Sequence, residues 1–159
     1  MITPPRRWFK DIQRDLGTIP DALEWYFTKL AEGHNEVNIS GTLIRVNQNQ
    51  PGLVAYYDAM HTDLDMILEF IERKHRIAKA KKLRELADAP PTNSKLTATD
   101  LKLLAETDDD VMALEQLSQE IRYVYKQFSS LMKAFEQRGY TLNNITKIRV
   151  AGLEEASVD

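Results

Sequence analysis

The sequence predicts a mostly α-helical protein built from two long helices and shorter helices near the N-terminus. Apolar residues recur at three- and four-residue spacing over two long stretches, about residues 52–88 and 107–138, as on the buried face of a helix. The six glycines fall mostly at the ends of predicted helices, including the shorter ones. A length of 159 residues is the size of one domain, so we expect residues 1–159 to fold together.

Residues 1–50 are predicted to contain two short helices. Gly17 is a natural end for the first helix, whose apolar residues are Trp8, Phe9, Ile12 and Leu16. Pro20 suits the first turn of the second helix, and Gly33 is its predicted end. The buried face of the second helix is predicted to comprise Leu23, Tyr26, Phe27 and Leu30.

The segment 36–47 can be interpreted in two ways. Residues 37–39 alternate apolar and polar side chains, Ser40-Gly41 is typical of a turn, and residues 43–46 favour β-structure. These features predict a small β-hairpin near 36–47. A continued helix is the alternative.

The long central helix is predicted over residues 52–88, where Pro51-Gly52 marks its start. Its apolar face stops after Ile71, and up to that point the face comprises Leu53, Tyr57, Met60, Leu64, Ile67 and Ile71. The next positions on the same face are Lys74, Ala78 and Lys81. The face therefore changes from apolar to cationic along one helix.

A basic block follows this change. Seven of the 21 Lys and Arg residues fall within residues 73–84, although the net charge of the chain is −3. Like charges packed so closely repel one another, and an anionic partner such as a polyphosphate backbone would stabilise them. A merely solvated helix surface is the alternative. The predicted nucleic-acid-binding residues are Arg73, Lys74, Arg76, Lys79, Lys81, Lys82 and Arg84.

Residues 97–150, after a proline-rich linker, are predicted to form the C-terminal helices. Thr97 and Asp100 have the spacing of a capping box, which predicts a short helix. Thr107 is the predicted hydroxyl cap and is followed by three carboxylates at 108–110, a pattern that the positive end of a helix stabilises. The second long helix is therefore predicted to begin there.

The second long helix has an apolar face wider than the central helix would cover, because that helix loses its own apolar face. The N-terminal helices or another copy of the chain must cover the remainder, and we expect another copy. Arg138-Gly139 is the predicted end of the helix, a short helix over 142–148 follows, and the acidic tail 151–159 is expected to be loose. The predicted oligomer-interface residues are Leu117, Ile121, Val124, Phe128, Leu131 and Phe135.

The sequence offers no recognisable site for catalysis, a metal or a cofactor. Asp58-x-x-His61 and Glu72-x-x-His75 have the carboxylate–histidine spacing of di-iron bundle proteins, but both lie on one predicted helix and cannot face each other. The sequence contains no glycine-rich phosphate loop, no nucleophile elbow and no cysteine. We therefore expect a protein that is not an enzyme and that has no cofactor and no metal site.

The location of the protein is expected to be cytoplasmic. No stretch approaches the ~20 consecutive apolar residues of a membrane-spanning helix, and the first residues lack the apolar core of a signal peptide. The absence of cysteine gives no sign of an oxidising compartment. We expect no membrane partner.

The C-terminal half has a distinctive order of parts. A run of apolar positions follows Asp109-Asp110-Val111 and includes Leu114, Leu117, Ile121, Phe128 and Leu131. The run is followed by Arg138-Gly139-Tyr140 and a short segment up to Ile145. Together with the basic central helix, the polar linker and the acidic tail, this order resembles the bacteriophage recombination mediators of the UvsY type. The resemblance covers roughly residues 52–155 and is strongest over 107–150.

The resemblance implies a non-enzymatic accessory factor of DNA recombination and DNA repair. Such mediators bind single-stranded DNA, form ring-like homo-oligomers through their C-terminal helices, and help a RecA-class recombinase to replace the single-strand-binding protein. By position, the resemblance implies an oligomer-forming region at 111–150 and DNA contacts at Lys79, Lys81, Lys82 and Arg84. If the protein is encoded by a phage, it acts in the cytoplasm of the host cell.

Two other functions fit parts of the sequence. A helical, oligomeric structural or interaction protein without DNA binding would need only the wide apolar face, with the basic block as solvated surface. A di-metal bundle enzyme is disfavoured because both carboxylate–histidine motifs lie on one helix.

Overall fold

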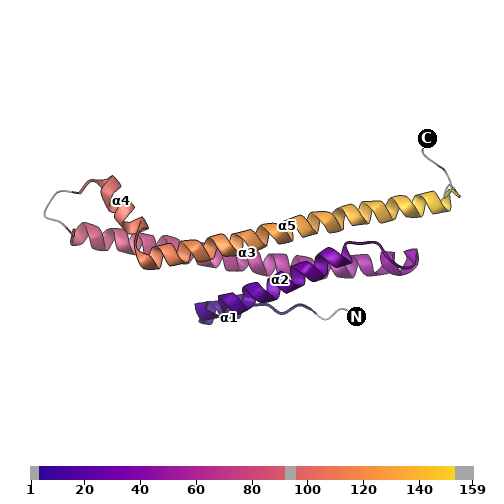
Figure 1. Cartoon of the computed structure of the whole chain (residues 1–159), viewed down its shortest axis with the longest axis horizontal. Coiled ribbons are helices and arrows are strands. Elements are labelled where there is room, and N and C mark those ends of the chain that lie inside the picture. Colours follow the sequence, from indigo (N-terminus) through magenta and orange to yellow (C-terminus); the bar gives the residue numbers. More distant parts are fainter. Residues whose placement is uncertain (1–3, 92–95, 153–159) are drawn as a thin grey trace.

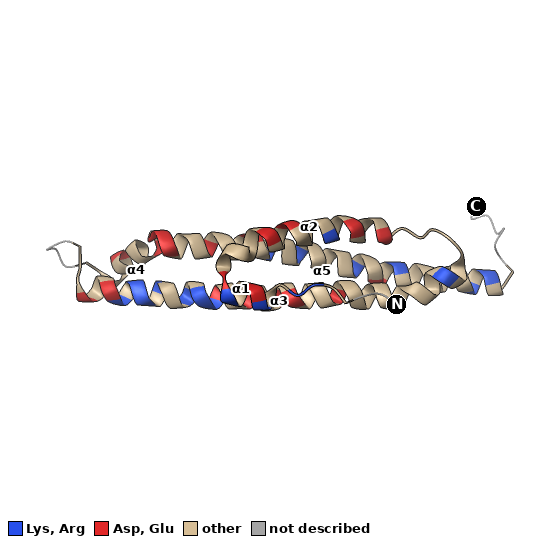
Figure 2. Ribbon diagram, turned by 90° about the horizontal axis from the view of Figure 1, so that it is seen from below, with Lys and Arg blue, Asp and Glu red and all other residues tan. Residues whose placement is uncertain are grey.

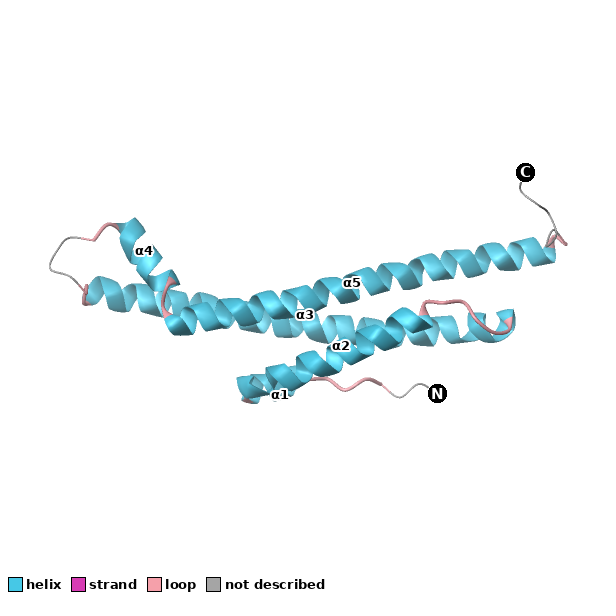
Figure 3. Ribbon diagram, viewed as in Figure 1, coloured by secondary structure: helices cyan, strands magenta, loops and turns pink. Residues whose placement is uncertain are grey.

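The computed structural model describes residues 4–91 and 96–152, and nearly all of this part of the chain is helical. The elements in order are α1 (Phe9–Arg14), a 3₁₀ helix η1 (Leu16–Thr18), α2 (Ile19–Glu36), α3 (Leu43–Asp88), α4 (Ala98–Glu106) and α5 (Asp109–Val150). Figure 3 shows helices and connecting loops, with no strand in the described residues. The predicted mostly α-helical class is confirmed.

The two long helices, α3 and α5, run antiparallel over most of the molecule (Figure 1). Glu72 of α3 contacts Arg122 of α5, whereas Gln50 near the start of α3 contacts Arg138 near the end of α5. α3 has 46 residues, which corresponds to a length of about 69 Å at 1.5 Å per residue. α2 lies along the middle of the pair, and α4 packs at the end where α3 passes the chain on to α5.

One hydrophobic core joins α1, α2, α3 and α5. At its centre Tyr26 of α2 meets Phe128 edge-on with ring centroids 5.8 Å apart, and Tyr57 of α3 stacks on Phe135 at 5.1 Å. Burial of each large apolar side chain contributes ~1.5–3 kcal/mol. The fully buried large side chains are Tyr26, Tyr57, Phe128, Phe135, Ile12, Ile19, Met60, Leu64, Ile67, Ile71, Ile121 and Leu131.

Gly33 marks the closest approach of α2 to the long pair. A Cβ atom at this position would lie 2.5 Å from Cδ2 of Leu131 and 2.9 Å from Cε1 of Tyr57. Glycine is therefore required by packing, and the prediction that it ends the helix is wrong, since α2 continues to Glu36.

The hairpin predicted near 36–47 is absent, and its prediction is wrong. α2 ends at Glu36, residues 37–42 form a loop, and α3 begins at Leu43 (Figure 3). Gly41 has φ of 101°, so the turn signal at Ser40-Gly41 marks an interhelical loop instead of a β-turn. Val46 is buried at a helical position of α3. Tertiary packing therefore overrides the β-preference of residues 43–46.

Two predicted helix boundaries are also wrong, because both long helices continue through residues that usually end helices. Pro51 lies inside α3, which begins eight residues earlier than the proline. α5 continues through Gly139 to Val150 as a single helix, so the separate short helix predicted over 142–148 is its last part. Leu142 is buried, and packing of this kind offsets the low helix propensity of glycine.

The predicted capping box of α4 is confirmed, but the N-terminal cap of α5 is Asp108 and not the predicted Thr107. Thr97 and Asp100 form the capping box of α4. α5 is capped by Asp108, whose carboxylate accepts hydrogen bonds from the backbone N–H groups of Asp110 and Val111.

The acidic tail predicted over 151–159 lies outside the described residues from 153 onward. Within the described chain, no helix is both long enough and apolar enough to cross a membrane.

Candidate nucleic-acid interface

The basic block occupies the last third of α3, next to α4, where Figure 2 shows the densest run of Lys and Arg on that helix. All seven predicted cations lie on this one helix. However, the surroundings of these residues differ with their position around the helix. The structure divides them into an inner pair, Lys79 and Lys82, an outer set of four, and Lys74, which lies over the ring of Phe70.

The inner pair faces α4 and the start of α5. The ammonium group of Lys79 lies 2.6 Å from a carboxylate oxygen of Glu106, and that of Lys82 lies 2.7 Å from a carboxylate oxygen of Asp108. At 100° per residue Lys82 is only roughly 20° around the helix from the buried Ile71. The inner pair therefore continues the side of α3 that packs against the rest of the chain.

These ion pairs perturb the pKa values of Lys82, Asp108 and Glu106. The side-chain hydrogen bond to Asp108 raises the pKa of Lys82. The side-chain hydrogen bond from Lys82, with help from the capped backbone N–H groups, lowers the pKa of Asp108. The side-chain hydrogen bond and the charge of Lys79 likewise lower the pKa of Glu106. Both lysines are thus already neutralised within the chain.

The outer set lies on the exposed side of α3, with Arg76 at the edge of a groove that Glu115 and Arg122 of α5 also line. Arg73, Arg76 and Arg84 lie roughly 140–160° around the helix from Ile71 at 100° per residue, and all three are exposed. Within residues 4–91 and 96–152, none of these three has a carboxylate at ion-pair distance. The side chain of Lys81 is 78% exposed, and its ammonium nitrogen lies 3.9 Å from a carboxylate oxygen of Glu85, which is a long distance for an ion pair. We call Arg73, Arg76, Lys81 and Arg84 the outer strip.

The outer strip has the geometry of a phosphate-binding surface. From Arg73 to Arg84 it extends about 16 Å along the helix, and guanidinium groups bind phosphate oxygens as a fork. The exposed Ile77 lies within the strip, and Lys74 lies beside it with its ammonium group 5.2 Å from the ring of Phe70. The strip itself carries no aromatic side chain. We therefore expect it to hold a backbone by charge, without reading bases.

The structure places most of the predicted oligomer-interface residues in the core of the chain itself. α2 and α3 cover Ile121, Val124, Phe128, Leu131 and Phe135, and Leu117 packs half-buried against the same core. The N-terminal helices were the other partner that the sequence allowed, and they cover this face. These residues therefore present no free surface to a second copy in this fold.

One residue of each carboxylate–histidine motif contacts α5. His61 lies 2.8 Å from the hydroxyl of Ser129 and stacks on Tyr125 with ring centroids 4.6 Å apart. Glu72 pairs with Arg122 of α5. In the part of the chain that the structure describes, no group of three or more His, Cys, Asp or Glu side chains is arranged to hold a metal ion.

Asp63 is the polar centre of the core, and it was not identified from the sequence as a buried residue. Asp63 is only 4% exposed and accepts hydrogen bonds from the backbone N–H of Trp8 at 2.7 Å and from the hydroxyl of Tyr26 at 2.6 Å. It fastens the N-terminal segment and α2 onto α3. Its position between Met60 and Ile67 on the apolar face was the available signal.

A comparison of the chain with models of known protein families, with curated proteins and with solved structures finds no match. The resemblance to the UvsY-type mediators therefore stays a prediction.

Proposed function

We propose that this chain binds single-stranded DNA through the outer strip and works as a non-enzymatic mediator of homologous recombination. The observation that supports binding is the outer strip, where four cations lie along one exposed helix face and three of them have no carboxylate partner within the described residues. The unpaired cations of the strip repel one another, and a row of phosphates that neutralises their charge removes this repulsion.

The affinity of one strip is expected to be modest and dependent on salt. If each chain neutralises ~4 phosphates of a single strand, raising the salt concentration from ~50 to ~200 mM weakens binding roughly fifty-fold. Several copies on one strand would gain avidity without any tight single site. Weak, reversible contacts suit a protein that must hand its strand to a RecA-class recombinase.

The mediator part of the proposal adds partners that the resemblance implies. These are the recombinase, the single-strand-binding protein and further copies of the chain. The described surface offers apolar area for such contacts outside the core. Phe27 of α2 and Tyr123 of α5 are exposed, and with Leu23 they line a groove of about 370 Å³.

The decisive experiment compares two sets of substitutions within the same basic block. The outer variant changes Arg73, Arg76, Lys81 and Arg84 to Ala, and the matched inner variant changes Lys79 and Lys82 to Ala. Fluorescence anisotropy with a labelled single-stranded oligonucleotide at ~50 and ~200 mM salt measures binding. We expect the outer variant to lose most of its affinity and its salt dependence, and the inner variant to bind like the wild type.

Circular dichroism accompanies both variants, because the outer side chains make few contacts and their removal should leave helical content unchanged. Equal affinity of the outer variant and the wild type would disprove the binding proposal. A labelled duplex of the same sequence in parallel tells whether single strands are preferred.

The alternative function is a helical oligomeric interaction protein that does not bind DNA. The exposed groove at Phe27 and Tyr123 favours it, since this apolar surface needs no nucleic acid. Light scattering coupled to size exclusion tests the shared oligomer element, and a mass near 18.3 kDa would contradict it. Tyr123→Asp is the suitable assembly variant, because Leu131 and Phe135 are core residues whose charging would unfold the chain.

A further inference from the structure

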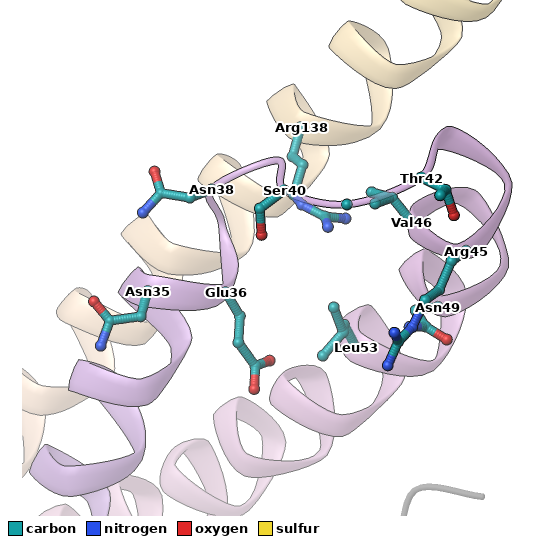
Figure 4. A pocket seen from close by; sticks show the side chains of 11 residues that line it. Asn35, Glu36, Asn38, Ser40, Thr42, Arg45, Val46, Asn49, Leu53 and Arg138 are labelled. Carbon is teal, nitrogen blue, oxygen red and sulfur yellow. The ribbon is translucent and has the colours of Figure 1, made fainter.

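A polar cavity of about 780 Å³ lies at the end of the molecule away from α4. Figure 4 shows its walls, which come from the last turn of α2, the loop 37–42, the first turns of α3, and Arg138 of α5. Its lining includes the amides Asn35, Asn38 and Asn49 and the hydroxyls Ser40 and Thr42. Such groups can donate hydrogen bonds to an oxygen-rich ligand.

Arg138 is the most unusual residue of this cavity. Its side chain is 7% exposed, and Figure 4 shows the guanidinium directed from α5 into the cavity. Nη1 donates to the amide oxygen of Gln50, whereas the buried Nε has no hydrogen-bond partner in the described residues. Burial lowers the pKa of Arg138, and the charge of Glu36 only partly opposes this effect. A buried cation with an unused donor is costly unless an anion joins it.

The first turn of α3 adds positive potential to the same cavity. Thr42 is its N-cap residue but makes no side-chain capping hydrogen bond, and the first turn contains no acidic residue. Instead it contains Arg45, which also lines the cavity. A helix N-terminus carries a partial positive charge, so a cation there is unfavourable without a neighbouring anion. By contrast, α5 begins with a capping carboxylate at Asp108 and acidic residues in its first turn.

Two independent features therefore converge on one ligand type. The cavity holds two guanidinium groups, at Arg45 and Arg138, and an uncapped helix end, against the single carboxylate of Glu36. We propose that this cavity is a binding site for a phosphate group. Arg45, Arg138 and the first turn of α3 bind its oxygens, while Glu36 repels it and keeps the affinity moderate.

This site is separate from the outer strip. Arg45 and Arg73 are 28 residues apart on one continuous helix, which places them about 42 Å apart along its axis. The phosphate group can be free inorganic phosphate or the phosphate of a nucleotide. The two proposals can fail independently. The outer variant changes no residue of the cavity, and the cavity variants change no residue of the outer strip.

The test measures binding of inorganic phosphate to the full chain by isothermal titration calorimetry, with sodium chloride at matched ionic strength as the blank. Deoxynucleoside 5′-monophosphate and the unphosphorylated nucleoside form the second arm. Arg45→Ala removes an exposed cavity cation, Glu36→Gln removes the repelling charge, and Lys147→Ala removes an exposed cation of α5 that does not line the cavity. Arg138→Met tests the buried guanidinium.

Wild type should bind phosphate saturably, and Arg45→Ala should weaken the affinity about tenfold or more, since a charge-assisted hydrogen bond is lost. Glu36→Gln should strengthen it, Arg138→Met should abolish it, and Lys147→Ala should leave it unchanged. Tighter binding of the monophosphate than of inorganic phosphate assigns the site to nucleotides; equal binding assigns it to free phosphate.

The proposal is overturned if wild type shows no saturable binding beyond the chloride blank, or if Arg45→Ala binds phosphate as Lys147→Ala does. It is equally overturned if Glu36→Gln weakens binding, because a ligand other than an anion would then be indicated. If circular dichroism shows that Arg138→Met does not fold, the two surface variants at Glu36 and Arg45 decide the outcome.

Discussion

The first part of α3, up to Ile71, and its last part, from Glu72 to Asp88, belong to one helix but have opposite surroundings. The first part buries Tyr57, Met60 and Leu64 between α2 and α5. The last part contacts α4 through Lys79 and α5 through Glu72 and Lys82, whereas the side that carries the outer strip is exposed. The difference shows that the number of neighbouring helices decides whether one helix serves as core or as charged surface.

Two substitutions near the boundary between the two parts of α3 should have the largest difference in effect. Ile71 is 0% exposed, whereas Arg73 lies on the opposite, exposed side. Ile71→Asp buries an unpaired charge and should reduce the free energy of unfolding by more than about 4 kcal/mol. Arg73→Asp should change it by less than about 0.5 kcal/mol but should weaken DNA binding. Urea unfolding and anisotropy measure the two effects, and equal stability losses would contradict the assignment of faces.

A second experiment tests the polar centre of the buried part. Asp63→Ala leaves the backbone N–H of Trp8 and the hydroxyl of Tyr26 without their acceptor. We expect a loss of roughly 2–3 kcal/mol in the free energy of unfolding. Asp65→Ala, at an exposed position of the same helix, is the matched control and should be neutral within about 0.5 kcal/mol. A similar loss in both variants would mean that the buried hydrogen bonds do not matter.

The smallest expected effect concerns the inner pair of the basic part. The pKa values of Asp108 and Glu106 are lowered in the folded chain from their ordinary values of 3.8 and 4.5. A lowered carboxyl pKa gives stability that is present above the unfolded value and is lost as the pH falls through the folded value. The contacts of α4 should therefore weaken as the pH falls below the ordinary pKa values of these two carboxyl groups. The global Tm should change little, because these groups are exposed.

NMR chemical shifts of the α4 amides against pH follow this change. The variant with Lys79 and Lys82 changed to Ala should show the weakened α4 contacts already at neutral pH. Shifts that do not respond to pH in the wild type would argue against any contribution of these ion pairs to the position of α4.

The sequence was sufficient for the helical class and for features that depend on local spacing. The capping box at Thr97, the acidic start of α5 and the apolar face up to Ile71 were all predicted, because they depend on residues within one or two turns. The position of the basic block was also predicted. Its division into the inner pair and the outer strip was not predicted, because this division depends on which side of α3 is covered by α4.

Features set by distant residues could not be predicted in the same way. Gly33 and Gly139 were interpreted as helix ends, but both helices continue past them, and at Gly33 the close approach of Leu131 and Tyr57 requires glycine. The buried role of Asp63 was not predicted, because its partners, Trp8 and Tyr26, lie far away in the chain. The N-terminal helices cover the apolar face of α5, which sequence reasoning had assigned to a second copy.

The antiparallel pairing of α3 with α5 has a consequence for the order of folding. Contacts of α3 with α4 and α5 join residues at steadily increasing separation: 27 residues for Lys79 and Glu106 of α4, 50 for Glu72 and Arg122 of α5, and 88 for Gln50 and Arg138 of α5. Closing a short loop costs less entropy than closing a long one, and each closed contact shortens the loop that remains for the next. We therefore expect the two helices to zip together from the α4 turn, so that the end holding the polar cavity forms last and opens first.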